Sequence, residues 1–293
     1  MPRSSPFDGR PPLEKFLYHY TSADTALTKI IPTGKLRAGS LKTMNDPRES
    51  KDWLFGMNLR TVVDEEAALN DAVAASKLAQ ACTRVISFAT DADAEGCVHP
   101  ECQFGRGFAH SAMWNHYARQ HTGACLIFDR EKLEAAVSKG LGAIGDSIRT
   151  GWIFFDSVEY GDRDRTFDMS SANPFILDPM DSNGDLRRLV LAHVARVRKE
   201  LIFRKGLDWA YEREYRIAVW DDGEDAMMLD IGDSLVGVVV TEDYGLAAGA
   251  EGPGKVAQVG MLQDTSRRHR IPARVLYWDN GVPKLGELKR KWP

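Results

Sequence analysis

The amino-acid sequence predicts an α+β fold in which helices flank a mixed, largely antiparallel sheet. Short strand-like runs are mixed irregularly with helical segments along the chain, which is typical of this class. The 293 residues suffice for one large domain or two small ones, and no internal repeat or break in composition requires a second domain. We therefore expect a single α+β domain over residues 15–293, preceded by a flexible, Pro-rich N-terminal tail over residues 1–14.

The bulk composition narrows the class of protein. Hydrophobic residues make up 43% of the chain and charged residues 27%, values that are normal for a soluble globular protein. The formal net charge of −4 argues against binding of nucleic acid through a general positive field, although a local basic groove stays open. No apolar run reaches the ~18 residues of a membrane span, and the N-terminus lacks the apolar centre of a signal peptide. Four cysteines in a chain of this length do not indicate a disulfide framework, so we expect a protein of the reducing cytoplasm.

The first elements follow from local patterns. Residues 17–21 form an aromatic, strand-like run, and Ser22 can cap a helix that extends to Ile31. Residues 36–38 are a candidate for a short strand. The Asn-Asp-Pro sequence at residues 45–47 is a turn signal, and its proline suits the first position of a helix.

Longer periodic segments predict the remaining elements. Apolar residues recur at helical spacing between residues 183 and 203, which makes this segment the clearest helix. Residues 90–107 carry no clear pattern and predict a long loop, of the kind that often forms a lid or a binding segment. Further helices are expected at residues 65–81, 111–119 and 256–262. Strands are expected at residues 84–89, 123–128, 152–160, 215–220, 227–231, 235–241 and 274–278.

The strongest signal for chemistry is the sequence Trp-Ala-Tyr-Glu-Arg-Glu-Tyr-Arg-Ile at residues 209–217. The alternation of a strand would place Glu212, Glu214 and Arg216 on one face and the aromatic and apolar side chains on the other. A glutamate on that face could orient a ribose hydroxyl and stabilise the positive charge that develops at an anomeric carbon. The alternative is a solvated strand edge with a local ion pair.

Three other segments carry candidate site residues, each with a purely structural alternative. His19 lies in the aromatic first strand, where it could meet a ligand or be a satisfied core or edge residue. Trp114 and Tyr117 lie on the predicted helix 111–119 and could form a wall for a flat ring or part of a packing stripe. The turn at residues 45–49 could line a site or be plain turn chemistry.

The cysteines suggest no metal site. Cys97 and Cys102 flank His99, but their spacing differs from the usual C-x-x-C and no second pair follows. We therefore expect no structural zinc and no other metal. Cys82 and Cys125 lie beside apolar runs, so we expect both to be buried.

Several blocks follow one another along roughly residues 16–240. They are Tyr18-His-Tyr-Thr-Ser22 with Gly34-x-Leu36, Asn45-Asp-Pro-x-Glu49, Val85-Ile-Ser-Phe88, Met113-Trp-x-His-Tyr117 with Gly123-x-Cys125, and Lys205 followed by Trp209-x-Tyr-Glu-x-Glu-Tyr-Arg216. Taken together and in order, these blocks resemble the bacterial family known as domain of unknown function 2971 (DUF2971), whose name carries no activity.

The opening strand carries His-x-Thr, a later strand ends in Ser-Phe, and two glutamates come late in the chain. These fewer features are similar to ADP-ribosyltransferases of the His-Tyr-Glu type, including the DNA-modifying, DarT-like enzymes. The resemblance implies an ADP-ribosyltransferase-like fold in which His19 contacts the ribose of NAD, Trp114 or Tyr117 stacks near the nicotinamide, and Glu212 or Glu214 is catalytic. It further implies NAD-binding roles for Tyr20, Thr21, Ser87, Ser111 and Arg216, with Asn45, Asp46, Glu49 and Lys205 near the site.

The function that this resemblance implies is cleavage of the nicotinamide–ribose bond of NAD and transfer of ADP-ribose to a macromolecular acceptor, a protein or a nucleic acid. Such an enzyme could be a toxin or a phage-defence effector with an antitoxin or other regulatory partner, without a membrane contact. A carboxylate would stabilise the oxocarbenium-like centre. Two alternatives stay open. One is a carboxylate-based hydrolase that uses Glu212 and Glu214 on a nucleic acid or sugar, and the other is a non-catalytic binding or sensor domain of a bacterial defence or stress system.

Overall fold

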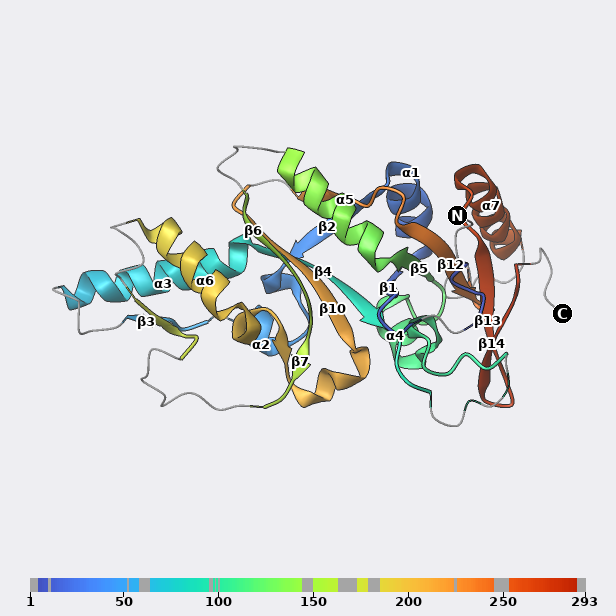
Figure 1. The fold of residues 1–293 in the computed structure, drawn as a ribbon, viewed down its shortest axis with the longest axis horizontal. Helices are drawn as coiled ribbons and strands as arrows, with labels where there is room; N and C mark the ends of the chain where they lie inside the picture. Colours follow the sequence, from blue (N-terminus) through green and yellow to red (C-terminus); the bar gives the residue numbers. More distant parts are fainter. Residues whose placement is uncertain are drawn as a thin grey trace. The chain divides into compact units, whose positions relative to one another are not determined.

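The computed structural model describes residues 5–9, 12–51, 53–57, 64–94, 97, 99, 101–143, 150–162, 173–178, 185–223, 226–244 and 253–288. These residues form an α+β fold with a mixed, mostly antiparallel sheet and flanking helices, as the sequence predicts (Figure 1). The chain divides into two compact units that alternate along the sequence. Unit 1 comprises Met1–Leu36, Phe88–Ala143 and Leu229–Pro293, and unit 2 comprises Arg37–Ser87 and Ile144–Met228. The expectation of a single domain over residues 15–293 stays a prediction.

The sheet of unit 1 is organised by a buried central strand. β5 (Ala124–Asp129) has an apolar run from Ala124 to Phe128 that is buried on both faces. β1 (Phe16–Thr21) pairs antiparallel with β5 on one side, and β12 (Leu235–Thr241) pairs antiparallel with it on the other. β13 (Ala273–Asp279) runs parallel to β12, and β14 (Val282–Glu287) pairs antiparallel with β13. β1 also pairs with the last residues of β4 (Thr83–Thr90).

The helical segments of unit 1 begin close to where the sequence predicts a helix after Ser22. A π-helical turn, η1 (Thr25–Ile30), leads into α1 (Ile31–Thr33), and Gly34 ends the helix in the left-handed region with φ 63°. The other helical segments are η4 (Gly107–Ala109), α4 (Ser111–Tyr117), α5 (Arg130–Ala143) and α7 (Pro253–His269).

Part of the expected N-terminal tail packs against unit 1. Pro6 is buried, and its carbonyl accepts a hydrogen bond of 2.9 Å from Arg106. The ring of Phe7 lies 6.5 Å from the ring of Phe108. Residues 1–4, 10 and 11 of the expected tail lie outside the described residues. The described residues of this segment therefore belong to the packed unit.

Unit 2 is built around the buried strand β10 (Glu214–Asp221). β6 (Thr150–Ser157) pairs antiparallel with β10, and β2 (Lys35–Ser40) pairs antiparallel with the first residues of β4. β11 (Met227–Asp230) pairs with β2. Two short pairs are parallel: β3 (Gly56–Met57) with β8 (Ile176–Leu177), and β7 (Glu159–Tyr160) with β9 (Arg204–Lys205).

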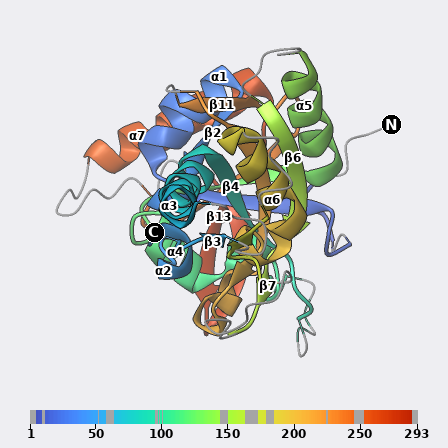
Figure 2. The same cartoon turned by 90° about the vertical axis from the view of Figure 1, so that its left-hand side faces the viewer.

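The helices of unit 2 cover an apolar core. α3 (Glu65–Cys82) and α6 (Leu186–Leu201) lie side by side in both views (Figure 1, Figure 2). Leu189, Val190 and Val194 of α6 are buried at the spacing that predicts the helix. They share the core with Trp53, Phe55, Phe203 and Trp220. The shorter segments are η2 (Leu41–Thr43), α2 (Pro47–Ser50) and η6 (Leu207–Glu212).

The patterns considered above do not predict every element. α5 and β14 have no predicted counterpart, although β14 follows an Asn280-Gly281 turn with φ of 50° and 78°. An Asn-Gly pair between strands is a strong hairpin signal, so β14 could have been found. Among the described residues, no helix combines the length and the apolar character needed to cross a membrane.

Gly123, which precedes β5, provides a test of the packing in unit 1. A Cβ at this position would lie 2.2 Å from the carbonyl oxygen of Thr21 and 2.9 Å from that of Ala118, so the backbone would have to move. We expect Gly123→Ala to lower the free energy of unfolding by about 1–3 kcal/mol, as measured by urea unfolding. Gly260→Ala on α7 is the control, because a Cβ added there would meet no atom within 4 Å beyond its own turn of helix. Gly260→Ala should raise the free energy of unfolding by about 0.4–1 kcal/mol. A loss of stability in both variants would contradict this packing.

Candidate functional site

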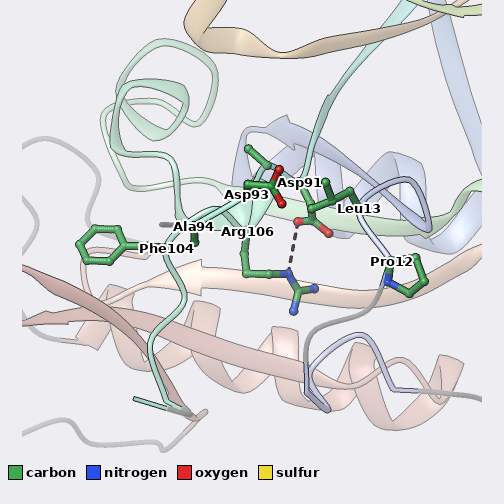
Figure 3. Close-up of a pocket in the computed structure, with 8 residues that line it drawn as sticks. Pro12, Leu13, Asp91, Asp93, Ala94, Phe104 and Arg106 are labelled. Atoms are coloured by element: carbon green, nitrogen blue, oxygen red, sulfur yellow. Dashed lines mark hydrogen bonds and ion pairs between the residues drawn. The ribbon is translucent and has the colours of Figure 1, made fainter. Parts of the chain in front are cut away.

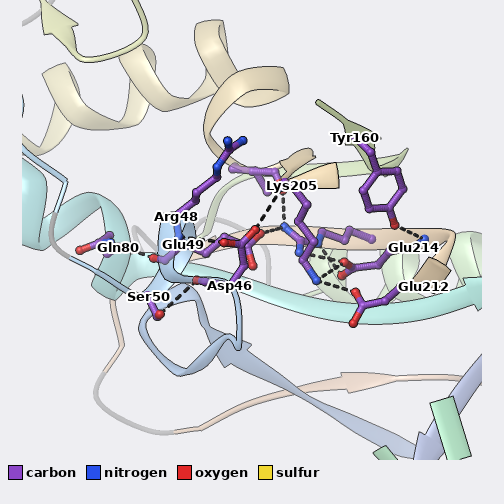
Figure 4. Close-up of polar contacts among 12 residues, drawn as sticks. Asp46, Arg48, Glu49, Ser50, Gln80, Tyr160, Lys205, Glu212 and Glu214 are labelled. Atoms are coloured by element: carbon purple, nitrogen blue, oxygen red, sulfur yellow. Dashed lines mark hydrogen bonds and ion pairs between the residues drawn. The ribbon is translucent and has the colours of Figure 1, made fainter. Parts of the chain in front are cut away.

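Six charged side chains of unit 2 converge in what we call the buried ionic cluster (Figure 4). It combines four carboxyl groups with two cationic groups, and none of the six residues is more than 4% exposed. All six are candidate site residues in the sequence analysis. The alternative considered there, a solvated strand edge, is wrong because these side chains are buried. The members are Asp46, Glu49, Lys205, Glu212, Glu214 and Arg216.

The backbone of residues 212–216 differs from the predicted strand and positions its two glutamates differently. Glu214 and Arg216 lie on β10 at i and i+2, so they share one face as expected. Glu212 instead ends the 3-10 helix η6, because Arg213 adopts the left-handed conformation with φ 45°. The prediction that Glu212 shares the strand face is therefore wrong. Glu212 reaches the cluster from a turn.

Arg216 is the centre of the cluster. Its Nε donates to Oε1 of Glu214 at 2.6 Å, and its Nη2 donates to Oε2 at 2.9 Å, which is a bidentate pair. Its Nη1 donates to Oε1 of Glu49 and to the carbonyl of Ile202. Burial alone would lower the pKa of Arg216, but the carboxylates of Glu214 and Glu49 outweigh burial and raise it. Arg216 is therefore a permanently charged group that holds three segments together.

Lys205 joins the two glutamates of the 212–214 segment. Its ammonium lies 2.7 Å from Oε2 of Glu212 and 2.7 Å from Oε2 of Glu214. Burial would raise the pKa of Glu214, but Arg216 and Lys205 lower it to about 2. Tyr160, whose hydroxyl accepts from the backbone N–H of Glu214 at 2.8 Å, fixes the start of β10. Glu214 is therefore ionised and fully engaged at neutral pH.

Glu49 differs from Glu214 in its protonation. Burial raises its pKa, and the charge of Arg216 offsets this only in part. Its Oε2 is buried and has no hydrogen-bond partner among the described residues. Glu49 thus takes up a proton more readily than Glu214, whose pKa is lowered.

The turn that carries Glu49 is fixed by hydrogen bonds. Asp46 caps α2, because its Oδ1 accepts from the N–H of Arg48 at 2.9 Å, and its Oδ2 accepts from the N–H of Gly206 at 3.4 Å. Gln80 donates to the carbonyl of Glu49 at 2.9 Å. Of the candidates in this turn, Asn45 is exposed, whereas Asp46 and Glu49 lie in the cluster.

Three groups next to the cluster reach the surface, and sequence reasoning did not assign them roles. The ammonium of Lys205 lies 5.2 Å from the ring centre of the half-buried Trp209. Arg48 is exposed and pairs with Asp162 at 2.7 Å. Gly206 lies between them, since a Cβ there would be 3.9 Å from Trp209 and 4.0 Å from Arg48. The sequence did contain a signal for two of these groups. Arg48 lies inside the Asn-Asp-Pro-x-Glu block, and Trp209 lies close to the two glutamates.

The remaining candidates lie on β1 and α4 of unit 1 and on β4. His19 is half-buried, with its ring 5.7 Å from that of Phe88. Tyr20 is buried, donates from its hydroxyl to the carbonyl of Gly107 at 2.5 Å, and packs edge-on against Trp114. Trp114 is fully buried, and its indole N–H donates to the carbonyl of Phe108, so its place is that of a core residue.

Other residues of this group are more accessible. Thr21, Ser87 and Tyr117 are half-buried, and Ser111 is exposed. Ser87 and the glutamates belong to unit 2, whereas the other three residues and His19 belong to unit 1. The convergence of His19 with Glu212 and Glu214 stays a prediction.

The cysteines differ in part from expectation. Cys97 and Cys102 form a disulfide, which the sequence argument for a reduced chain did not predict. Cys82 and Cys125 are free and buried, as expected. Within the described residues, no group of three or more His, Cys, Asp or Glu side chains is arranged to hold a metal ion.

Comparison with known proteins supports one of the two resemblances. Residues 113–217 match the family described as "Protein of unknown function (DUF2971)". The matched segment runs from α4 into β10 and includes Lys205, Glu212, Glu214 and Arg216. No curated protein and no solved structure matches the chain. The resemblance to ADP-ribosyltransferases stays a prediction.

The two acids that bind Arg216 should respond differently to neutralisation. Glu214→Gln removes a carboxylate that balances two buried cations, so we expect a loss of about 3–5 kcal/mol in the free energy of unfolding. Glu49 has a raised pKa, so its contribution to stability is complete below its unfolded pKa and is lost as the pH rises through its folded pKa. Glu49→Gln cannot ionise, and at pH 8 it should be at least as stable as the wild type. Urea unfolding at pH 8 tests both variants, and equal losses would contradict the assignment.

Proposed function

We propose that the chain is an NAD-dependent ADP-ribosyltransferase that acts on a macromolecular acceptor, a protein or a nucleic acid. The observation that carries the proposal is that Glu212 and Glu214 both lie 2.7 Å from the single ammonium group of Lys205. Carboxylates held in this way are fixed before a substrate arrives, so they can stabilise a developing cation with little reorganisation. Breaking the nicotinamide–ribose bond creates such a cation at the anomeric carbon.

The charges of the cluster divide the roles of the two glutamates. Both oxygens of Glu214 are engaged by Arg216 and Lys205, so its negative charge is already balanced. We therefore assign the reacting carboxylate to Glu212, and we assign Glu214 and Arg216 to positioning Lys205. Glu212 is itself buried at the end of η6, whose Leu207 is 57% exposed. Access of a substrate then requires part of η6 to move.

The residues beside the cluster suit the chemical groups of NAD. Trp209 supplies a flat aromatic face for a planar ring, and Arg48 supplies a guanidinium for a phosphate. Because the ion pair between Arg48 and Asp162 is exposed, it contributes little to stability, and an anionic ligand can replace Asp162 at small cost.

A non-catalytic binding or sensor domain is the second candidate. The observation that favours it is the burial of the whole cluster together with the pairing of its cations, which also describes a purely structural ion network. In this case the surface around Arg48 and Trp209 would bind a ligand without chemistry.

Release of nicotinamide from NAD is the decisive assay. We expect wild-type protein to release nicotinamide and to label a protein or nucleic-acid acceptor in a cell extract when the ADP-ribose of NAD is labelled. Glu212→Gln should reduce release by a factor on the order of a hundred, with the affinity for NAD retained, because one fixed stabiliser of the transition state is lost. Glu66→Gln is the matched control, since Glu66 is exposed on α3.

The outcomes separate the two candidates. Binding of NAD without release of nicotinamide in any extract would favour the sensor domain. Unchanged release in Glu212→Gln would remove that residue from the reacting role. A toxin or defence role within the proposal predicts that expression arrests bacterial growth, that Glu212→Gln relieves the arrest, and that an antitoxin or regulatory partner suppresses it.

A further inference from the structure

A cavity of about 350 Å³ opens on unit 1, and none of the residues that line it is among the candidate site residues named above (Figure 3). It is lined by Pro12 and Leu13, by residues 91–94, and by Phe104 and Arg106. Its volume is at the lower end of the range for small-ligand sites, ~300–1,000 Å³. In Figure 3, Phe104 lies on one side and Pro12 and Leu13 lie on the other, with the charged residues between them.

The two buried charges of this cavity neutralise each other. Nε of Arg106 donates to Oδ1 of Asp91 at 3.2 Å, and the hydroxyl of Tyr18 donates to Oδ2 of Asp91 at 2.9 Å. The remaining hydrogen bonds of Arg106 go to the hydroxyl of Tyr18 and to the carbonyls of Pro6 and Gly9. The guanidinium therefore has a structural role. Its positive charge is balanced by the carboxylate of Asp91, so the pair gives the cavity no net charge.

The backbone of the cavity wall is fixed. The N–H of Ala92 donates to the carbonyl of Gly105 at 2.7 Å, which ties residues 91–94 to residues 104–106. Gly105 has φ 79°, and a Cβ there would lie 2.4 Å from the carbonyl oxygen of Ala92. Only glycine permits this close approach, so the two walls hold their spacing without a ligand.

Two lining side chains remain available to a ligand. Asp93 is exposed, and among the described residues no hydrogen bond or ion pair engages its carboxylate. Phe104 is 46% exposed, which is unusual for an aromatic side chain that lines a cavity. Leu13, 42% exposed, adds apolar surface opposite Phe104.

We propose that this cavity binds an organic cation, an ammonium or guanidinium group on an apolar stem. The carboxylate of Asp93, which no described residue engages, supplies the counter-charge, the ring of Phe104 supplies a face that attracts a cation, and Leu13 and Pro12 contact the stem. An anion is disfavoured because the two aspartates of the lining, Asp91 and Asp93, outnumber its one cation, Arg106. The cation is either a free amine or a Lys or Arg side chain of a polypeptide, because both present the same group.

Calorimetric titration of the full chain tests the proposal with choline and with 3,3-dimethylbutan-1-ol, which has the same shape and no charge. We expect choline to bind with a dissociation constant in the millimolar range and the neutral alcohol to bind at least fivefold more weakly. Asp93→Asn and Phe104→Ala should each weaken choline binding roughly threefold to fivefold. The matched controls are Asp243→Asn and Met261→Ala, exposed residues of unit 1 outside the cavity, and they should leave binding unchanged.

The comparison of sources uses the peptides acetyl-Gly-Lys-Gly-amide and acetyl-Gly-Arg-Gly-amide. Tighter binding of a peptide than of choline would support a polypeptide side chain, and the reverse would support a free amine. Equal binding of choline and the neutral alcohol would overturn the proposal. So would the absence of binding by choline and by both peptides at ligand concentrations about 50-fold above the expected dissociation constant. Loss of binding in the control variants to the same extent as in Asp93→Asn would overturn it as well.

Discussion

The structure of unit 2 depends on one buried guanidinium, that of Arg216. Its donors reach Glu214 on the same strand, Glu49 in the turn before α2, and the carbonyl of Ile202 after α6. Removing a charge from water is costly, and a buried ion pair repays that cost only when its geometry is good and its remaining donors are satisfied. Arg216 meets this condition only if all three segments are in place, so the network selects one arrangement of the turn, the strand and the end of the helix.

Unit 1 also contains a buried arginine that joins several segments. Arg106 is buried and directs its donors to Asp91, to Tyr18 and to the carbonyls of Pro6 and Gly9, which fastens the chain before β1 to the loop after β4. The two networks differ in their net formal charge. Arg106 and Asp91 balance each other, whereas the cluster around Arg216 holds four carboxyl groups against two cations. Burial raises the pKa of Glu49, and the neighbouring carboxylate of Glu214 adds to this rise.

Two helices and one pair of site residues could be predicted from the sequence, because short-range patterns determine them. The helical spacing in α6 and the Pro at the start of α2 identified these helices, and the i, i+2 spacing of Glu214 and Arg216 placed both on one face. The position of Glu212 could not be predicted in this way, since one left-handed residue, Arg213, separates Glu212 at the end of η6 from β10, which begins at Glu214. The contact between Glu49 and Arg216 joins residues 167 positions apart, and no periodicity reports such a pair.

The central claim is that Arg216 distributes charge unequally between the two acids that it binds. A carbon-13 NMR titration of the glutamate carboxyl groups, with assignments from Glu49→Gln and Glu214→Asp, measures this directly. We predict that Glu214 titrates well below the ordinary value of about 4.3 and that Glu49 titrates above it. Titration of both groups near the ordinary value would show that they are solvated and would contradict the buried network.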